Sequence, residues 1–237
     1  MGLIAHNLEQ VQHRMAEASI RAGRDPSSVK LVAVTKTVSP EKILEAFSCG
    51  AEIFGENRVQ ESLEKVPLVE KALGTSLSGR PGPRWHMVGH LQRNKARLVI
   101  GTFELIHSVD SLALIEELEK RAAARGARMK ALLQVNVAGE APKSGCRPEE
   151  VEGLAIAVEN SPHLDLEGLM TMPPLPQDAE ESRPWFRKVR ELRDRLVDSG
   201  RGELRELSMG MTADFEVAIE EGATLVRIGS AIFGPRD

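Results

Sequence analysis

Eight short apolar runs alternate with segments of helical periodicity along this 237-residue chain. The runs are typical of strands buried on both faces, as in parallel sheets, and Leu31-Val32-Ala33-Val34 is an example. Such alternation predicts a parallel α/β sheet, and eight units in this length favour a single (β/α)8 TIM-type barrel over an open doubly wound sheet. The predicted strands span residues 29–35, 52–55, 84–89, 105–109, 129–137, 166–172, 206–209 and 224–228.

An extra helix is expected before the first strand. Ile4, Leu8, Val11 and Met15 recur at the spacing of one helix face, and Gly23 marks the end of that segment. No linker, repeat or charge run divides the chain, so we expect one domain over residues 1–237. Glycine-rich nucleotide motifs of the Rossmann or P-loop type are absent from the sequence. The other predicted helices lie at 39–49, 59–73, 94 onward, 111–124, 148 onward, 185–196 and 214–221.

Composition argues against several classes of protein. With 31 basic and 35 acidic residues the net charge is −4, whereas a general nucleic-acid binder usually has a basic excess. The two cysteines, Cys49 and Cys146, form no disulfide or metal-binding pattern. No secretory signal is recognisable, and no run approaches the ~18 apolar residues of a membrane span. We therefore expect a cytoplasmic protein that binds neither nucleic acid nor membrane.

Lys36 is the sharpest candidate for chemistry, because barrel sites lie at the C-terminal ends of the strands and Lys36 follows the first strand. An amine in a low-dielectric cavity has a lowered pKa, and the neutral form attacks carbonyls. The alternative is a structural lysine at the barrel rim or in an ion pair, and position alone favours it. Other residues expected near the strand ends are Glu56, Asn57, His86, His90, His107, Asp110, Asn136, Thr171 and Met172.

A second cluster follows the seventh and eighth strands, where barrels commonly bind phosphate. It comprises the segments Ser208-Met209-Gly210-Met211-Thr212 and Arg227-Ile228-Gly229-Ser230. Glycine allows the backbone to approach a phosphate closely, although ordinary turn chemistry accounts for the same residues equally well. A nucleophilic lysine, a phosphate cup and an arginine together suit pyridoxal 5′-phosphate (PLP), or a sugar phosphate in a Schiff-base aldolase.

Two further motifs carry weaker signals. His86 and His90 have the spacing of a helical metal site, but they fall on a strand and turn with no acidic partner between them, so we expect no metal. Lys143-Ser144-Gly145 is either a functional loop or a turn, and a turn is favoured.

Several longer motifs resemble the pyridoxal phosphate homeostasis protein family, also called proline synthase co-transcribed homologues. The resemblance covers essentially the whole chain in order. It is carried by Leu31-Val32-Ala33-Val34-Thr35-Lys36, Gly55-Glu56-Asn57-Arg58-Val59-Gln60-Glu61, Trp85-His86-Met87-Val88-Gly89-His90-Leu91-Gln92-Arg93-Asn94-Lys95, Leu207-Ser208-Met209-Gly210-Met211-Thr212 and Val226-Arg227-Ile228-Gly229-Ser230-Ala231-Ile232-Phe233-Gly234.

The resemblance implies a barrel similar to the N-terminal domain of alanine racemases, with PLP held as a Schiff base on Lys36. It also implies that Arg227 faces the pyridine nitrogen and that Asn57 lies beside the cofactor. The family usually has serine at the position of Thr212; the hydroxyl is retained, so we expect phosphate binding to be retained. The implied phosphate cup comprises Thr212, Gly229 and Ser230, with Ser208 and Met211 in its lining.

Two functions fit such a site: a carrier or regulator that buffers and transfers PLP, or a PLP enzyme such as an amino-acid racemase. A racemase of this architecture resembles one that takes a tyrosine from a second domain; this chain has no tyrosine, and we expect no second domain. An arginine at the ring nitrogen also weakens the electron sink that a carbanion needs. We therefore predict a monomeric carrier with no catalytic residues, which contacts PLP-requiring apo-enzymes transiently. His86 or His90 as a substitute base, and a sugar-phosphate lyase using Lys36 without PLP, remain alternatives.

Overall fold

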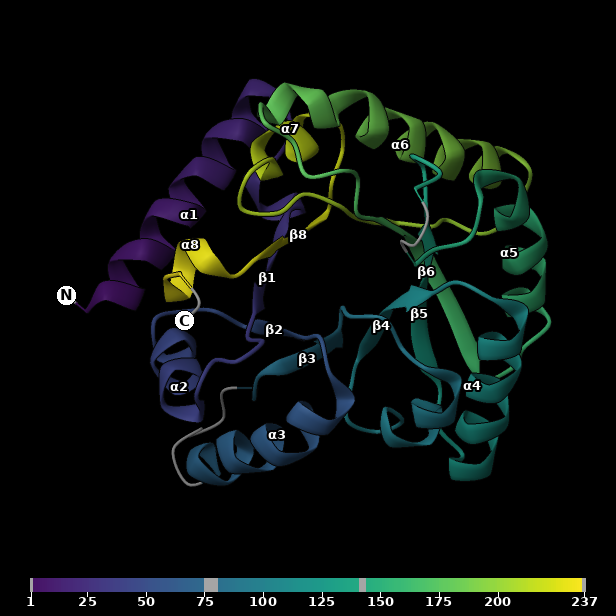
Figure 1. Cartoon of the computed structure of the whole chain (residues 1–237), viewed down its shortest axis with the longest axis horizontal. Helices are drawn as coiled ribbons and strands as arrows, with labels where there is room; N and C mark the ends of the chain where they lie inside the picture. Colours follow the sequence, from purple (N-terminus) through teal and green to yellow (C-terminus); the bar gives the residue numbers. More distant parts are fainter. Residues whose placement is uncertain (1, 75–80, 141–143, 236–237) are drawn as a thin grey trace.

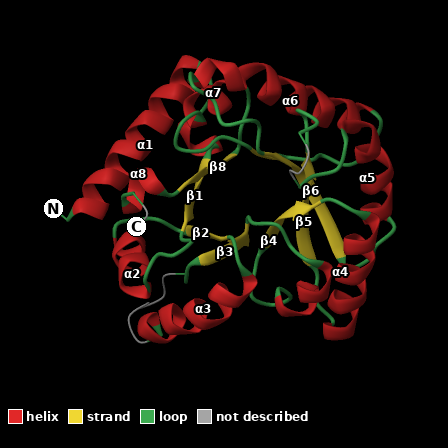
Figure 2. Cartoon of the chain, in the orientation of Figure 1, coloured by secondary structure: helices red, strands yellow, loops and turns green. Residues whose placement is uncertain are grey.

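Eight parallel strands close into a barrel in chain order, and the eighth pairs with the first. The computed structural model describes residues 2–74, 81–140 and 144–235, so Lys143 of the predicted turn lies outside the described residues. Figure 1 shows the helices as a ring around the strands, and Figure 2 separates the two layers by colour. The predicted (β/α)8 fold with an N-terminal helix is thereby confirmed. The strands are β1 Lys30–Val34, β2 Ile53–Glu56, β3 Arg84–Met87, β4 Leu105–Val109, β5 Met129–Val135, β6 Leu164–Thr171, β7 Glu206–Ser208 and β8 Leu225–Ile228.

The helices between the strands follow the predicted order. Short 3-10 helices, labelled η, precede two of them, and the segment predicted as a helix from residue 94 is itself a 3-10 helix. The α-helices are α1 Leu3–Arg21, α2 Pro40–Ser48, α3 Val59–Leu73, α4 Leu112–Arg125, α5 Val151–Glu159, α6 Arg183–Asp198, α7 Phe215–Glu220 and α8 Ser230–Phe233. The 3-10 helices are η1 Pro26–Ser28, η2 Arg93–Leu98, η3 Pro148–Glu150 and η4 Ala179–Ser182.

Most of the apolar core lies between the strands and the surrounding helices. A smaller apolar cluster fills part of the barrel interior and includes Val32, Leu105, Leu132 and Leu225. Successive residues of a strand point to opposite faces, so inward positions recur at every second residue. This alternation also directs polar side chains of β3, β4, β7 and β8 into the interior.

Helix α1 packs across the seam where β8 meets β1. Arg14 makes a bidentate pair with Glu216 just after the start of α7, with both N–O distances at 2.9 Å. Asn7 Nδ2 donates to the carbonyl of Ile232 in α8 at 3.0 Å. In Figure 1 α1 runs alongside α7 and α8. The helix therefore joins the first part of the barrel to its last two helices.

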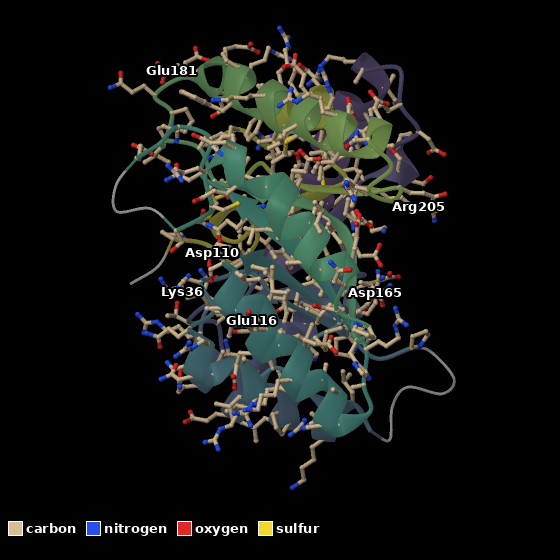
Figure 3. All side chains as sticks on the ribbon, turned by 90° about the vertical axis from the view of Figure 1, so that its right-hand side faces the viewer. Lys36, Asp110, Glu116, Asp165, Glu181 and Arg205 are labelled. Carbon is tan, nitrogen blue, oxygen red and sulfur yellow. The ribbon has the colours of Figure 1, made fainter. Side chains whose placement is uncertain are left out.

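The two ends of the barrel differ in character. Figure 3 shows Lys36 and Asp110 on one side of the molecule and Asp165 and Arg205 on the other. The first side is the C-terminal end of the strands. At the opposite end, Lys30 pairs with Glu206 at 2.8 Å, among other ion pairs. Within the described ranges, no helix is long and apolar enough to cross a membrane.

Candidate functional site

A cavity of about 600 Å³ opens at the C-terminal end of the barrel. Six of the eight residues predicted for cofactor binding line it, although they come from three separate segments of the chain. Its walls also include apolar side chains from the ends of β1 and β3 and from the segment after β6. The lining residues are Val34, Asn57, Val88, Met172, Leu175, Pro176, Met211, Thr212, Ala213, Asp214, Arg227, Gly229 and Ser230.

Lys36 stands at the edge of this cavity in the turn after β1. It is half-buried, and it lines a smaller adjoining cavity of about 160 Å³. The two cavities share Val34, Gly229 and Ser230 as a common wall. The next residue, Thr37, has φ of +62°, a left-handed conformation that is uncommon for a β-branched side chain. Surrounding contacts must therefore hold this turn in place.

A buried ionic cluster supplies those contacts. Lys65 Nζ, from α3, donates to the Thr35 carbonyl at 2.7 Å, to Glu56 Oε1 at 2.9 Å and to Glu61 Oε1 at 2.7 Å. Glu61 Oε1 also accepts the Thr37 backbone N–H at 2.6 Å. Burial raises the pKa of Glu56, while its bonds to Thr35 and Lys65 act in the opposite direction. The cluster fixes the turn that presents Lys36.

Asn57 reaches the cavity because two loops approach each other very closely. A Cβ on Gly89, after β3, would lie 2.2 Å from the Asn57 carbonyl oxygen, so only glycine fits without movement. The side-chain oxygen Oδ1 of Asn57 is buried and has no hydrogen-bond partner in the described part of the chain. A buried acceptor of this kind is costly unless a ligand or water satisfies it.

The loops after β7 and β8 bring two hydroxyl groups together. Ser230 Oγ and Thr212 Oγ1 lie 3.4 Å apart, with Ser230 exposed and Thr212 half-buried. The loop that carries Thr212 is fixed by Asp214, whose carboxylate accepts the Met211 N–H and the Ser182 hydroxyl, both at 2.8 Å. Hydroxyl groups fixed in this way suit an anionic ligand group.

Arg227 projects from β8 into the barrel interior beneath the cavity and is only 4% exposed. Its guanidinium donates to Ser208 Oγ at 2.6 Å and to the Thr171 carbonyl at 2.8 Å, both neutral acceptors. Burial lowers the pKa of Arg227 to about 10, with Asp214 opposing the shift. The side chain therefore keeps its positive charge at neutral pH and presents it to the cavity.

Ser208 lies below the cavity and does not form part of its wall. It is fully buried between Arg227 and His107, so its place is not in the rim with Thr212 and Ser230, where the phosphate cup was expected. Sequence reasoning missed this contact because Ser208 and His107 are 101 residues apart.

The two histidines of the predicted pair point to different places. His90 lies at the barrel mouth, 3.7 Å from Asp110. His86 and His90 were expected to flank the end of a strand over residues 84–89; β3 ends earlier, at Met87, and the His86 side chain points inward, where its Nδ1 lies 2.9 Å from His107 Nε2. His86 lines a cavity at the opposite end of the barrel, so it cannot act as a base at the mouth. Among the described residues, no cluster of histidine, cysteine and acidic side chains could hold a metal ion.

The site thus combines a nearby amine, a buried cation, two hydroxyl groups and an unsatisfied acceptor around one cavity. Its apolar walls accommodate a flat ring, and the hydroxyl groups accommodate a phosphate. These features together suit a small aromatic aldehyde that carries a phosphate group.

Comparison with known proteins gives a consistent picture. The family model of the alanine racemase N-terminal domain matches residues 4–237. The pyridoxal phosphate homeostasis protein of Aquifex aeolicus is 44% identical over 229 residues, which cover 97% of this chain and 96% of that protein. The solved structure of PipY from Synechococcus elongatus with PLP bound has a TM-score of 0.80 at 36% identity, covering 98% of this chain and 100% of that one. Alanine racemase from Corynebacterium glutamicum shares the fold, with a TM-score of 0.68 at 17% identity, and this chain covers 61% of it.

Proposed function

The chain belongs to the alanine racemase N-terminal domain family and, within it, to the pyridoxal phosphate homeostasis proteins; from this premise we propose that it binds PLP at the barrel mouth. The protein holds the cofactor for release to PLP-requiring apo-enzymes and turns over no substrate of its own. The observation that carries the proposal is the convergence of Lys36, Arg227, Thr212 and Ser230 on two adjoining cavities.

The residues present fit PLP at each end of the cofactor. We place the phosphate at Thr212, Gly229 and Ser230, with Met211 in the lining of that cup, and the ring against the apolar walls of the cavity. Asn57 Oδ1, buried without a partner in the described structure, is available to a polar substituent. The cofactor itself supplies an aldehyde that condenses with a primary amine, and we assign Lys36 as that amine.

Arg227 is the residue that argues against catalytic turnover. It lies below the cavity and is charged at neutral pH, so we place its guanidinium opposite the pyridine nitrogen. A cation there keeps the ring nitrogen unprotonated and weakens its capacity to stabilise a carbanion. The 237 residues contain no tyrosine, and His86 points away from the mouth. Amino-acid racemisation is therefore the less favoured function.

The exposure of the site suits release. Lys36 is half-buried and Ser230 is exposed, so an incoming amine can reach the lysine from solution. One barrel supplies residues for each end of the cofactor, and we propose that the protein works as a monomer. The free thiols of Cys49 and Cys146 suit a reducing compartment, and we propose the cytoplasm.

The visible absorption spectrum tests the covalent assignment. We expect the purified protein with PLP to absorb in the visible range, and borohydride reduction to attach the cofactor to the peptide carrying Lys36. Lys36→Ala should abolish the band, whereas Lys42→Ala should keep it, because Lys42 lines the same smaller cavity but is an exposed residue of α2 and does not belong to the turn after β1. A colourless protein would instead support a lyase that uses the lysine alone. Label on another lysine of the native protein would contradict the role of Lys36.

Transfer assays test the carrier function. The PLP-loaded protein should restore activity to a PLP-requiring apo-enzyme, including when a trap for free PLP is present. Racemase, transaminase and decarboxylase assays with common amino acids should give no more turnover than free PLP. Robust turnover of one amino acid that disappears in Lys36→Ala would make the protein an enzyme.

A further inference from the structure

Four buried polar side chains from four strands form a continuous line of hydrogen bonds through the barrel. Arg227 Nη1 donates to Ser208 Oγ at 2.6 Å, and Ser208 Oγ lies 2.8 Å from His107 Nδ1. His107 Nε2 lies 2.9 Å from His86 Nδ1. None of the four residues is more than 4% exposed.

The line joins the two ends of the barrel. Arg227 lines the cavity at the mouth. His86 lines a cavity of about 160 Å³ at the N-terminal end of the strands, which is also lined by Lys30, Arg84 and Glu206. The line is thus a polar path across an interior that also holds the apolar cluster of Val32, Leu105, Leu132 and Leu225.

The chemistry of arginine fixes the direction of every bond in the line. A guanidinium only donates, so Ser208 Oγ must accept from Arg227. Among the described residues that oxygen has one other hydrogen-bond partner, His107 Nδ1, so the serine hydroxyl donates to it. A neutral His107 then carries its hydrogen on Nε2 and donates to His86 Nδ1, which leaves the His86 hydrogen on Nε2 as well.

Both imidazoles are neutral, as this direction requires. Burial lowers the pKa of His86 to about 3. Burial also lowers the pKa of His107 well below its ordinary value, and His86 and Arg227 add to that effect.

We propose that His107 and His86 are positioning residues for Arg227, and that each is held as the neutral Nε2–H tautomer. A hydroxyl group that donates a hydrogen bond becomes a better acceptor, because neighbouring bonds in a chain polarise one another. His107 therefore strengthens the Ser208 contact that orients the guanidinium, and His86 accepts the His107 Nε2–H and so holds the His107 ring in place. The effect on bound PLP rests on the proposed function, whereas the tautomers do not.

Nitrogen-15 NMR of the cofactor-free protein tests the hydrogen-bonded line directly. Of the six histidines, two should show a single Nε2–H tautomer and no titration between pH 5.5 and 8. Ser208→Ala removes the donor to His107 Nδ1 and should release that tautomer preference. Assignment of His107 as Nδ1–H, or its titration near the ordinary histidine pKa, would overturn the proposal.

The spectrum and affinity of bound PLP test the positioning role. His107→Met removes both hydrogen bonds at similar volume, and His107→Gln retains one acceptor and one donor. We expect His107→Met to shift the visible band and to weaken PLP binding by roughly three- to tenfold, the size of one lost hydrogen bond. His107→Gln should restore most of the affinity, and His13→Gln, at an exposed position of α1, should behave as wild type.

The outcomes separate this inference from the proposed function. If wild type binds PLP and both His107→Met and Ser208→Ala match it in band position and affinity, the positioning role is wrong. If His107→Met does not fold, Ser208→Ala decides alone. If wild type binds no PLP, the proposed function fails, and the NMR tautomers still decide whether the line of hydrogen bonds exists.

Discussion

The Thr212 hydroxyl of the predicted phosphate cup can be removed without changing the shape of the side chain, because valine has the same shape as threonine. Thr212→Val deletes the hydroxyl, and a hydrogen bond to a charged group contributes about 1.5–3 kcal/mol, or roughly ten- to a hundredfold in affinity. We expect PLP affinity to fall by that factor, whereas affinity for pyridoxal, which has no phosphate, should hardly change. Spectroscopic titration with both compounds measures the ratio.

The matched control is Thr212→Ser, which keeps the hydroxyl and restores the residue usual in the family. It should bind PLP as tightly as wild type. Equal losses of PLP and pyridoxal affinity in Thr212→Val would show that the residue does not contact the phosphate.

At the scale of elements, the contact between the ends of β2 and β3 determines where Asn57 stands. Gly89→Ala places a Cβ against the Asn57 backbone, so the two strand ends must separate. We expect a loss of roughly 1–3 kcal/mol in the free energy of unfolding, the usual cost of overpacking, together with weaker PLP binding. Denaturant unfolding and PLP titration check the two effects.

Gly153→Ala makes the same chemical change in α5, where nothing lies within 4 Å of the new Cβ. It should raise the free energy of unfolding by roughly 0.5–1 kcal/mol through helix propensity and leave PLP binding unchanged. A Gly89→Ala protein as stable as wild type would mean that the two loops can separate freely.

Elements with strong periodicity could be predicted from the sequence. The bounds of β4 and α3 agree with prediction to the residue, because apolar spacing and turn residues act locally. Helix α8 was not predicted, since four residues are too few to show a period. The inward direction of His86 follows from the alternation of side chains along β3. The period of two that places Val88 on the same face as His86 could have indicated this direction from the sequence.

At the scale of the whole molecule, the buried histidines couple folding to pH. Unfolded histidine has a pKa of about 6.5, whereas native His86 has a pKa of about 3 and His107 is also lowered. Between those values the unfolded state binds more protons, so stability falls on acidification below about pH 6.5 and levels off above it. The slope should be about 1.4 kcal/mol per pH unit for each histidine.

Denaturant unfolding between pH 5 and 7.5 measures this slope. Working above pH 5 keeps most carboxylates ionised in both states. His86→Gln should reduce the slope by about 1.4 kcal/mol per pH unit, which corresponds to one proton, and His13→Gln should not change it. Trp85 in β3 and Trp185 in α6 should report the same transition as circular dichroism, as one domain over residues 1–237 requires. Stability that rises on acidification would contradict the neutral histidines.

Site residues that follow a single strand could be predicted from the sequence, whereas contacts between side chains of distant strands could not. Lys36, Arg227 and Thr212 could be proposed from position and motif. The line from His86 to Arg227 depends on the closed barrel, because only closure brings β3, β4, β7 and β8 around one interior. The residues that flank each of these positions in the sequence do not indicate such contacts.

The packing of α1 has a consequence for the timing of folding during synthesis. Its contacts with Glu220, Glu216 and Ile232 span 199, 202 and 225 residues, so the first helix of the barrel binds its last two helices. Contacts of such long range slow folding, and at about 5–20 residues per second the ribosome exposes an open half-barrel for many seconds. The Lys36 turn and the loops that carry Thr212 and Ser230 meet only when that seam closes. A barrel that is still being synthesised therefore has no complete cofactor site, and the cofactor is bound only after β8 and α8 have formed.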